Sequence, residues 1–114
     1  MLVQDALAII SREACSGISA KSIADRLGVS RRLLDIRFSE LQGQSATMAL
    51  RDARIAEAKR LLIETSVPFG ELARRCGYGG VDGLNKAFRT ACGVSMHKFR
   101  NASRSSGQKI GAGD

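Results

Sequence analysis

The sequence is poor in the residues that build catalytic, metal-binding or disulfide-rich sites. It has one histidine, His97, and three cysteines that form no C-x-x-C pair. Scattered cysteines in odd number argue against a disulfide framework and against a zinc site. A lone histidine and dispersed carboxylates also offer no convergent catalytic site. We therefore expect no enzyme, no cofactor and no metal, and we interpret Cys15, Cys76 and Cys92 as buried or half-buried residues of a cytoplasmic protein.

Long apolar runs and aromatic residues are also scarce. No stretch approaches the roughly 18 apolar residues that signal a transmembrane helix. Because Asp5 and Glu13 interrupt the early apolar residues, we expect no secretion signal. The 114 residues include four phenylalanines, one tyrosine and no tryptophan, so any hydrophobic core must be small. This predicts one domain, or two small lobes that share a helix.

Positive charge is what the sequence has in excess. The formal net charge is +7, the isoelectric point is near 10.0, and arginine outnumbers lysine. A small, basic, arginine-rich chain indicates a polyanionic partner. A membrane surface would also attract it, but the sequence contains no basic amphipathic helix with bulky apolar anchors. Nucleic acid is therefore the favoured partner, with an acidic protein as the alternative.

Residues 22–38 predict a helix, a tight turn and a second helix. Gly28 ends the first helix, and Ser30 caps the second. A short helix braced against another that shows arginines at its N-terminal end suits insertion into a DNA major groove. The alternative is an ordinary helical hairpin with a solvated charged face. The apolar positions recur at helical spacing, as Ile23, Ala24 and Leu27 in the first helix and Leu34, Phe38 and Leu41 in the second.

The chain contains this unit twice. Residues 23–29 match residues 72–78 at an offset of 49, and residues 34–45 match residues 84–95 at an offset of 50. Glycines and serines recur in this alignment together with the apolar positions. Fixed offsets for such residues are not expected of helical proteins in general, so we interpret the pattern as an internal repeat. The matched residues outside the apolar stripes are Gly28 with Gly77, Gly43 with Gly93 and Ser45 with Ser95.

The remaining segments predict an all-α chain. We expect an amphipathic helix over residues 2–15, a long helix over 46–64, and shorter helices over 69–76 and 81–91, followed by a last turn with Met96 and Phe99. The long helix contains neither glycine nor proline. At about 1.5 Å per residue it spans close to 28 Å. The expected divisions are 1–45 for the first lobe, 46–65 for the connector, 66–100 for the second lobe and 101–114 for a disordered tail.

The combined signature resembles the DNA-binding domain of the AraC/XylS family of bacterial transcription regulators. The resemblance covers about residues 5–100. The residues that carry it are Ala24, Gly28, Ser30, Leu34, Phe38, Gly43, Arg54, Ala58, Leu61, Leu62, Leu72, Ala73, Gly77, Tyr78, Phe88, Gly93, Phe99 and Arg100. It implies a homeodomain-like, all-α fold of about seven helices, with two helix-turn-helix lobes joined by a long connector.

The same resemblance implies sequence-specific binding to the double-stranded DNA of an operator or promoter, in the cytoplasm at the bacterial nucleoid. Residues 30–38 and 76–78 are most similar to sugar-operon regulators of the family, which implies an activator of a sugar catabolic operon, with xylose as the candidate sugar. RNA polymerase is a further partner implied in this way. Most family members also carry a sensor domain, for which 114 residues leave no room, so we expect either a C-terminal fragment of a longer regulator or a stand-alone DNA-binding domain. Two residues depart from the family pattern and put the rigidity of the second lobe in doubt, namely Leu84 in place of an aromatic and Met96 in place of proline.

Base contacts are expected at the exposed N-terminal ends of the two reading helices. Arg31 and Arg32 begin the first one, and an arginine there can bond O6 and N7 of guanine for about 1 to 3 kcal/mol of discrimination. By resemblance, the first lobe also reads through Asp35 and Ile36, although Asp35 is equally explained as a favourable charge near a helix N-terminus. The equivalent positions of the second lobe are Val81, Asp82, Asn85 and Lys86. This second face has fewer donors, so we expect the first lobe to carry most of the specificity.

Phosphate contacts are expected around these helices, although each of these side chains is also explained as ordinary solvated surface. On the connector, Arg54 is expected to brace the two lobes rather than touch DNA. The alternative to DNA binding is a protein-interaction module whose basic faces meet acidic partners. The candidates for phosphate contact are Lys21, Ser30, Arg37, Arg89, Lys98 and Arg100.

Overall fold

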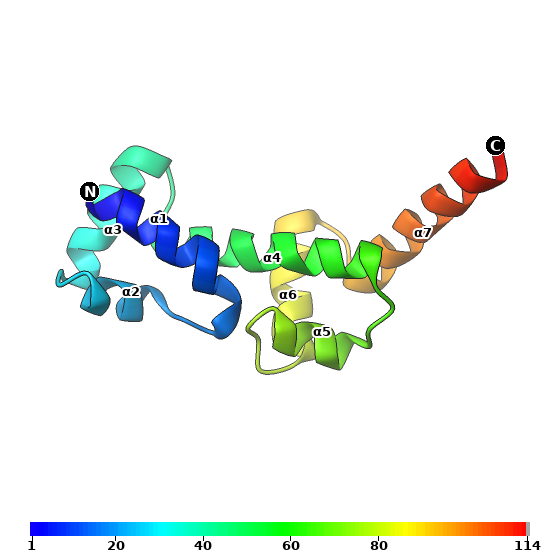
Figure 1. Ribbon diagram of the computed structural model, residues 1–114, viewed down its shortest axis with the longest axis horizontal. Coiled ribbons are helices and arrows are strands. Elements are labelled where there is room, and N and C mark those ends of the chain that lie inside the picture. Colours follow the sequence, from blue (N-terminus) through cyan, green and yellow to red (C-terminus); the bar gives the residue numbers. More distant parts are fainter. Residues whose placement is uncertain (114) are drawn as a thin grey trace.

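The computed structural model describes the backbone of residues 1–113 and the side chains of residues 1–104, and its regular secondary structure in this described part is all helical (Figure 1). This confirms the all-α prediction. The elements are α1 (Leu2–Glu13), the 3-10 helix η1 (Ala14–Ser16), α2 (Ala20–Arg26), α3 (Arg31–Gln42), α4 (Ala46–Glu64), α5 (Phe69–Arg75), α6 (Val81–Cys92) and α7 (Met96–Gly113).

Serine side chains begin the three helices that follow α1. The hydroxyl oxygens of Ser19, Ser30 and Ser45 each accept a hydrogen bond from the backbone N–H three residues later, at 3.1, 3.0 and 3.2 Å. Such a cap typically stabilises a helix by about 1 kcal/mol relative to alanine. The predicted cap at Ser30 is thereby confirmed. In the second lobe, Pro68 and Gly80 precede α5 and α6 and make no side-chain cap bond.

Two hydrophobic cores lie at opposite ends of α4. The first contains Ile23, Leu34 and Phe38, and the second contains Leu84 and Phe88; all five side chains are fully buried. The connector helix contributes Ala46, Ala49 and Leu50 to the first core and Ile55, Ala58, Leu61 and Leu62 to the second. Both departures from the family pattern are therefore accommodated, because Leu84 and Met96 are each 0% exposed inside the second core.

One predicted core residue, Leu41, lies outside the core. Its side chain is 69% exposed. The prediction was wrong because the last turn of α3 extends past the core that α1, α2 and α4 build (Figure 1). Helical periodicity identifies the side of a helix that faces inward, but it does not show where along the helix the partner surface ends.

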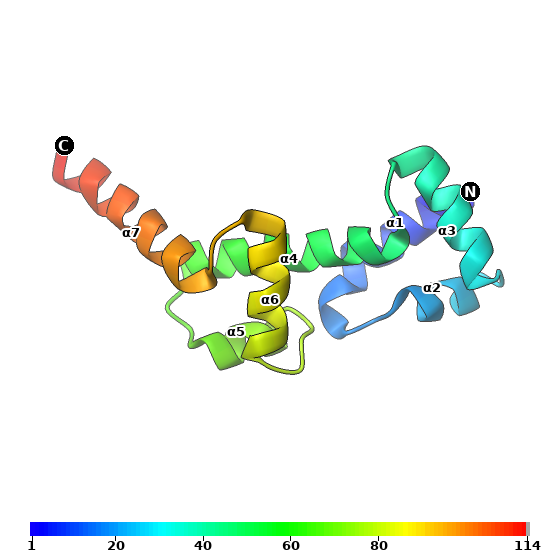
Figure 2. The same cartoon turned by 180° about the vertical axis from the view of Figure 1, so that it is seen from behind.

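The two lobes repeat the same arrangement along α4. In Figure 2, α6 crosses in front of α4 and α3 lies beyond the N-terminal end of α4, and both helices run from the lower to the upper part of the view. The N-terminal ends of both helices lie along the same edge of the molecule, next to α2 and α5 respectively (Figures 1 and 2). The second unit is therefore related to the first mainly by a translation along α4, so α3 and α6 are presented on one common side.

The segment predicted as a disordered tail is helical in the described part. Helix α7 begins at Met96 and continues to Gly113, and residue 114 lies outside the described residues. Two arginines one turn apart engage the start of this helix. Arg100 donates to the Val67 carbonyl at 3.0 Å, and Arg104 donates to the Ser66 hydroxyl at 2.8 Å. These bonds hold the first turns of α7 against the loop after α4, and composition alone does not reveal them.

The lobes meet where the backbone of one touches the backbone of the other. Gly77, in the turn after α5, has φ +90°, and a Cβ at this position would lie 3.0 Å from the carbonyl oxygen of Cys15 and 3.1 Å from the nitrogen of Gly17. The matching residue of the first lobe, Gly28, has φ +73° and no atom within 4 Å of its Cβ position. Both positions need a left-handed backbone, but only Gly77 also needs the missing side chain for close packing.

This pair of glycines provides a matched test. We expect Gly77→Ala to lower the free energy of unfolding by about 1 to 3 kcal/mol more than Gly28→Ala, because alanine at 77 adds an overpacking cost to the shared cost of a positive φ. Urea denaturation of both variants measures the difference. Equal losses would show that the close approach between the lobes does not contribute to stability.

Candidate nucleic-acid interface

The outer face of α3 carries one arginine held in place and one that is unengaged. Arg31 pairs with Asp35 at 3.3 Å and donates to the Thr47 hydroxyl of α4 at 2.9 Å. Arg32 is exposed and has no hydrogen bond or ion pair within the described residues. Ile36 is 46% exposed on the same helix. Among the side chains of α3 predicted to contact bases, Arg32 and Ile36 are therefore the ones presented directly to a ligand.

Asp35 is only partly available for contact with a base. One of its oxygens pairs with Arg31, and the other is buried without a hydrogen-bond partner among the described residues. Thr47 was missed by the sequence analysis, although it holds Arg31 in place. No sequence signal identifies this contact, since 16 positions separate the two residues and tertiary packing alone brings α3 and the start of α4 together.

The outer face of α6 is more mixed in charge and partly occupied by internal contacts. Asp82, Lys86 and Arg89 are exposed and line a shallow hollow together with Asn85 and Thr90. The side-chain oxygen of Asn85 accepts a hydrogen bond from the backbone N–H of Met96 at 3.3 Å, so this residue also caps α7. Val81 is half-buried against the second core. The structure thus brings all four predicted residues to α6, but only Asp82 and Lys86 project without an internal partner in the described part.

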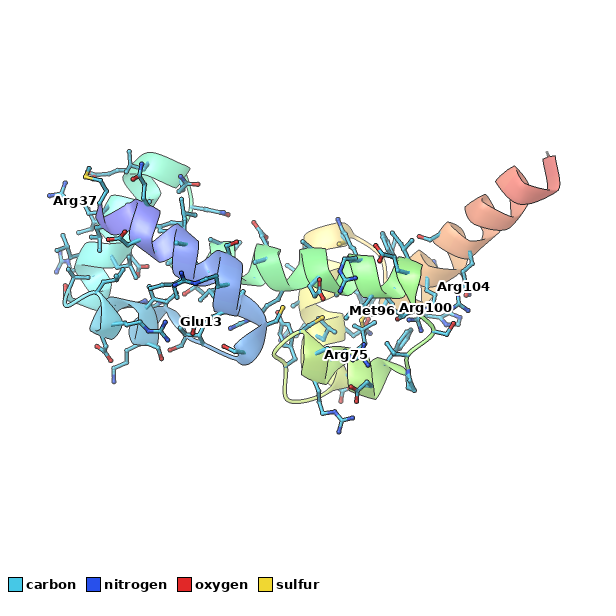
Figure 3. All side chains as sticks on the ribbon, viewed as in Figure 1. Glu13, Arg37, Arg75, Met96, Arg100 and Arg104 are labelled. Carbon is cyan, nitrogen blue, oxygen red and sulfur yellow. The ribbon has the colours of Figure 1, made fainter. Side chains whose placement is uncertain are left out.

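The residues predicted to contact phosphate separate into surface and structural groups. Lys21, Lys98 and Arg89 are exposed, and Arg37 is exposed at 3.5 Å from Glu40. Figure 3 places Arg37 at the far end of the first lobe, away from the second. The Ser30 hydroxyl is occupied as the cap of α3, at 3.0 Å from the Leu33 nitrogen.

Arg100 is a structural residue rather than a phosphate ligand. Its guanidinium donates to the carbonyls of Leu62, Val67 and Thr65 at 3.2, 3.0 and 3.2 Å and lies 5.2 Å from the centroid of the Phe69 ring. Figure 3 shows it beside Arg104 against the end of α4 and the following loop. Burial at this position lowers the pKa of Arg100 from its ordinary value. The predicted phosphate contact does not fit this placement, because the loop carbonyls already engage the side chain.

Cysteine chemistry and metal binding find no support in the geometry. Cys76 is fully buried, and burial raises the pKa of its thiol to about 12, so the reactive thiolate is a negligible species near neutral pH. Cys15 and Cys92 are half-buried, as predicted. Within the part of the chain that the structure describes, no three histidine, cysteine or acidic side chains gather in a way that could hold a metal ion.

Comparison with known proteins identifies the family. Residues 23–102 match the model of a helix-turn-helix domain, and the chain is similar to solved AraC-type domains. The chain belongs to the AraC/XylS family. It is an AraC-type DNA-binding domain of the kind found in transcription regulators, and this family is one of DNA-binding proteins rather than enzymes, which confirms the prediction of no enzymatic role.

Two solved structures of AraC-type domains illustrate the likeness. The C-terminal domain of AraT, a response regulator from Geobacillus stearothermophilus, has a TM-score of 0.85 and 30% identity, over 89% of this chain and 84% of that one. The DNA-binding domain of the global transcriptional factor AdpA, solved in complex with a target DNA, has a TM-score of 0.85 and 29% identity, over 91% of this chain and 94% of that one.

Full-length regulators of the family are longer than this chain. The xylose operon regulatory protein of Escherichia coli K12 is 28% identical over 99 residues, which make up 87% of this chain and 25% of that protein. The chain thus spans about a quarter of the length of the xylose operon regulatory proteins that it matches. None of the helices that the structure describes has the length and hydropathy needed to cross a membrane.

The placement of Arg100 predicts a loss of stability rather than a loss of phosphate contacts. We expect Arg100→Ala to lower the free energy of unfolding by about 1 to 3 kcal/mol, because it removes the hydrogen bonds to three partly buried carbonyls. Thermal denaturation checks this. Lys98→Ala removes a neighbouring positive charge from the exposed surface and serves as the control; a similar loss of stability in both variants would contradict the structural role of Arg100.

Proposed function

We propose that this domain binds double-stranded DNA sequence-specifically, with α3 and α6 inserted into two successive major grooves on one side of the duplex. The observation that supports this most strongly is that α3 and α6 begin along one common edge of the molecule (Figure 2). The formal net charge of +7 favours a polyanion. AdpA, whose domain has the same fold at 29% identity, was solved on its target DNA.

The length of the connector suits this mode of binding. The 19 residues of α4 span roughly 28 Å at about 1.5 Å per residue. Successive major-groove faces of a duplex lie about 34 Å apart. The connector is thus somewhat shorter than the groove repeat, and both reading helices reach one duplex if the DNA bends toward the protein. The energy needed for such bending depends on the DNA sequence.

A steep salt dependence is the first test of this function. We expect the logarithm of the association constant for a random duplex to fall linearly with the logarithm of salt concentration, with a slope of about −0.9 per phosphate neutralised. Fluorescence anisotropy with a labelled 25-base-pair duplex measures it. A slope near zero would remove the DNA-binding proposal and favour an acidic protein partner.

Most sequence specificity is assigned to the first lobe. Arg32 is exposed at the start of α3 and has no bonding partner among the residues that the structure describes, while Arg31 is already oriented by Asp35 and Thr47. In the second lobe Asn85 is engaged as a cap, so its contribution to base recognition is limited. On this proposal α6 increases the affinity for DNA through Lys86 and Arg89 and helps to fix the position of the domain along the duplex.

This division predicts a ranking of two variants. Arg32→Ala is expected to remove about 1 to 3 kcal/mol of discrimination between the preferred site and single-base variants, because it loses a bidentate contact to guanine. Asn85→Ala is expected to change discrimination less. Binding-site selection from a random library, followed by affinity measurements on single-base variants, tests the ranking. A larger loss of discrimination in Asn85→Ala, with the fold verified by circular dichroism, would reverse the assignment.

We also propose that the domain serves an activator of a sugar catabolic operon, with xylose as the candidate sugar. The support is its similarity to the xylose operon regulatory proteins of Escherichia coli and Haemophilus influenzae, at 28% and 27% identity over 99 residues. Effector sensing and contact with RNA polymerase would then depend on a complete regulator. The preferred site obtained by selection should occur upstream of sugar catabolic genes in the source genome, and its absence there would remove this assignment.

A further inference from the structure

Arg54 lies at the middle of α4, between the stretches of this helix that enter the two cores. Its Nε donates to the carbonyl of Ala14 at 2.7 Å, and its Nη2 donates to the carbonyl of Ile18. The guanidinium carbon lies 5.8 Å from the centroid of the Tyr78 ring, within the range of a cation–π contact. One side chain on the connector therefore contacts η1 and the entry to α2 in the first lobe and the α5–α6 turn in the second.

This contact lies within a larger seam between the lobes. Gly77, next to Tyr78, packs against the backbone of Cys15 and Gly17. A hollow beside it is lined by residues from both lobes, including Gly77, and by Arg31 and Thr47 at the start of α3 and α4. The seam is thus continuous with the part of α3 that is proposed to read DNA.

A helix such as α4 is stiff along its axis, but each lobe packs on its own half of that helix. What limits rotation of one lobe relative to the other is contact between the lobes themselves. In the described part of the chain, the side chain that joins both lobes to the connector at this seam is that of Arg54. Losing it would leave both cores intact while loosening the angle between α3 and α6.

We infer that Arg54 is a positioning residue for DNA recognition: it fixes the relative rotation of α3 and α6 and thereby the base-pair spacing between the two DNA segments that the lobes read. This inference rests on the proposed function. Each additional base pair rotates the second segment by about 35° around the duplex axis. A rigid pair of readers cannot follow that rotation, and the benefit of linking two binding units is lost when they cannot engage together.

Arg60 offers a matched control on the same helix. Its guanidinium bonds Glu57 at 2.7 and 2.8 Å and Glu64 at 3.3 Å, all within α4, and in the described part of the chain no hydrogen bond joins it to another helix. Replacing either arginine by glutamine removes one positive charge. We therefore compare how the DNA affinity of Arg54→Gln and of Arg60→Gln depends on the base-pair spacing. A difference between the two variants reflects the contacts at the seam rather than the loss of one positive charge.

The experiment uses the duplex that the unmodified chain selects from a random 25-base-pair library. Derivatives carry one or two extra base pairs between the two protected segments, which are located by footprinting. Fluorescence anisotropy then gives the affinity of each chain for each duplex. For the unmodified chain and Arg60→Gln, we expect about tenfold or greater loss of affinity on insertion, whereas Arg54→Gln should bind the original duplex more weakly and lose less than about threefold on insertion.

The outcomes separate the inference from the function on which it rests. If the unmodified chain fails to bind any selected duplex, or binds all spacings alike, two-lobe recognition is wrong and the inference falls with it. If the unmodified chain is sensitive to spacing and folded Arg54→Gln is equally sensitive, the inference alone is overturned. Thermal denaturation verifies the fold; should Arg54→Gln not fold, Tyr78→Leu removes the contact to the second lobe alone, and undiminished sensitivity in that variant overturns the inference.

Discussion

The burial of one helix in two separate hydrophobic cores is the constraint on which the rest of this domain depends. α4 contributes Leu50 to the core of the first lobe and Leu61 and Leu62 to that of the second. Neither lobe has enough aromatic or aliphatic residues to form a large core alone, so each gains stability from packing on the shared helix. The same packing determines that α3 and α6 emerge on one side, which is the property that suits a duplex.

The two lobes are copies in topology but not in local chemistry. Serine caps begin α2 and α3, whereas α5 and α6 follow Pro68 and Gly80. On α3, Arg32 is free for a ligand, while on α6 the side chain of Asn85 is committed to α7. These asymmetries are consistent with a first lobe specialised for specificity and a second lobe that supplies affinity and register.

Much of the fold could be predicted because its signals are local. Serine caps, the glycine turns and the apolar positions of α3, α4 and α6 depend on neighbours within a few residues, and the glycine turns and apolar positions occur in both copies of the internal repeat. The errors came from long-range contacts. Leu41 is exposed because the core ends before the last turn of α3, and Arg100 and Arg104 bond a distant loop from the first turns of α7.

The sequence by itself determined the helix-turn-helix repeat, the long connector and the basic character that indicates a polyanion, since each follows from short-range pattern or composition. Only the tertiary structure decided which arginines serve the surface and which serve the interior. Arg32, Arg54 and Arg100 have the same side chain and the same helix propensity. Arg32 faces solvent, Arg54 joins the two lobes, and Arg100 holds the loop after α4. The physical reason is that a guanidinium bonds whichever carbonyls the fold brings near it, and those carbonyls lie 33 to 40 residues away along the chain.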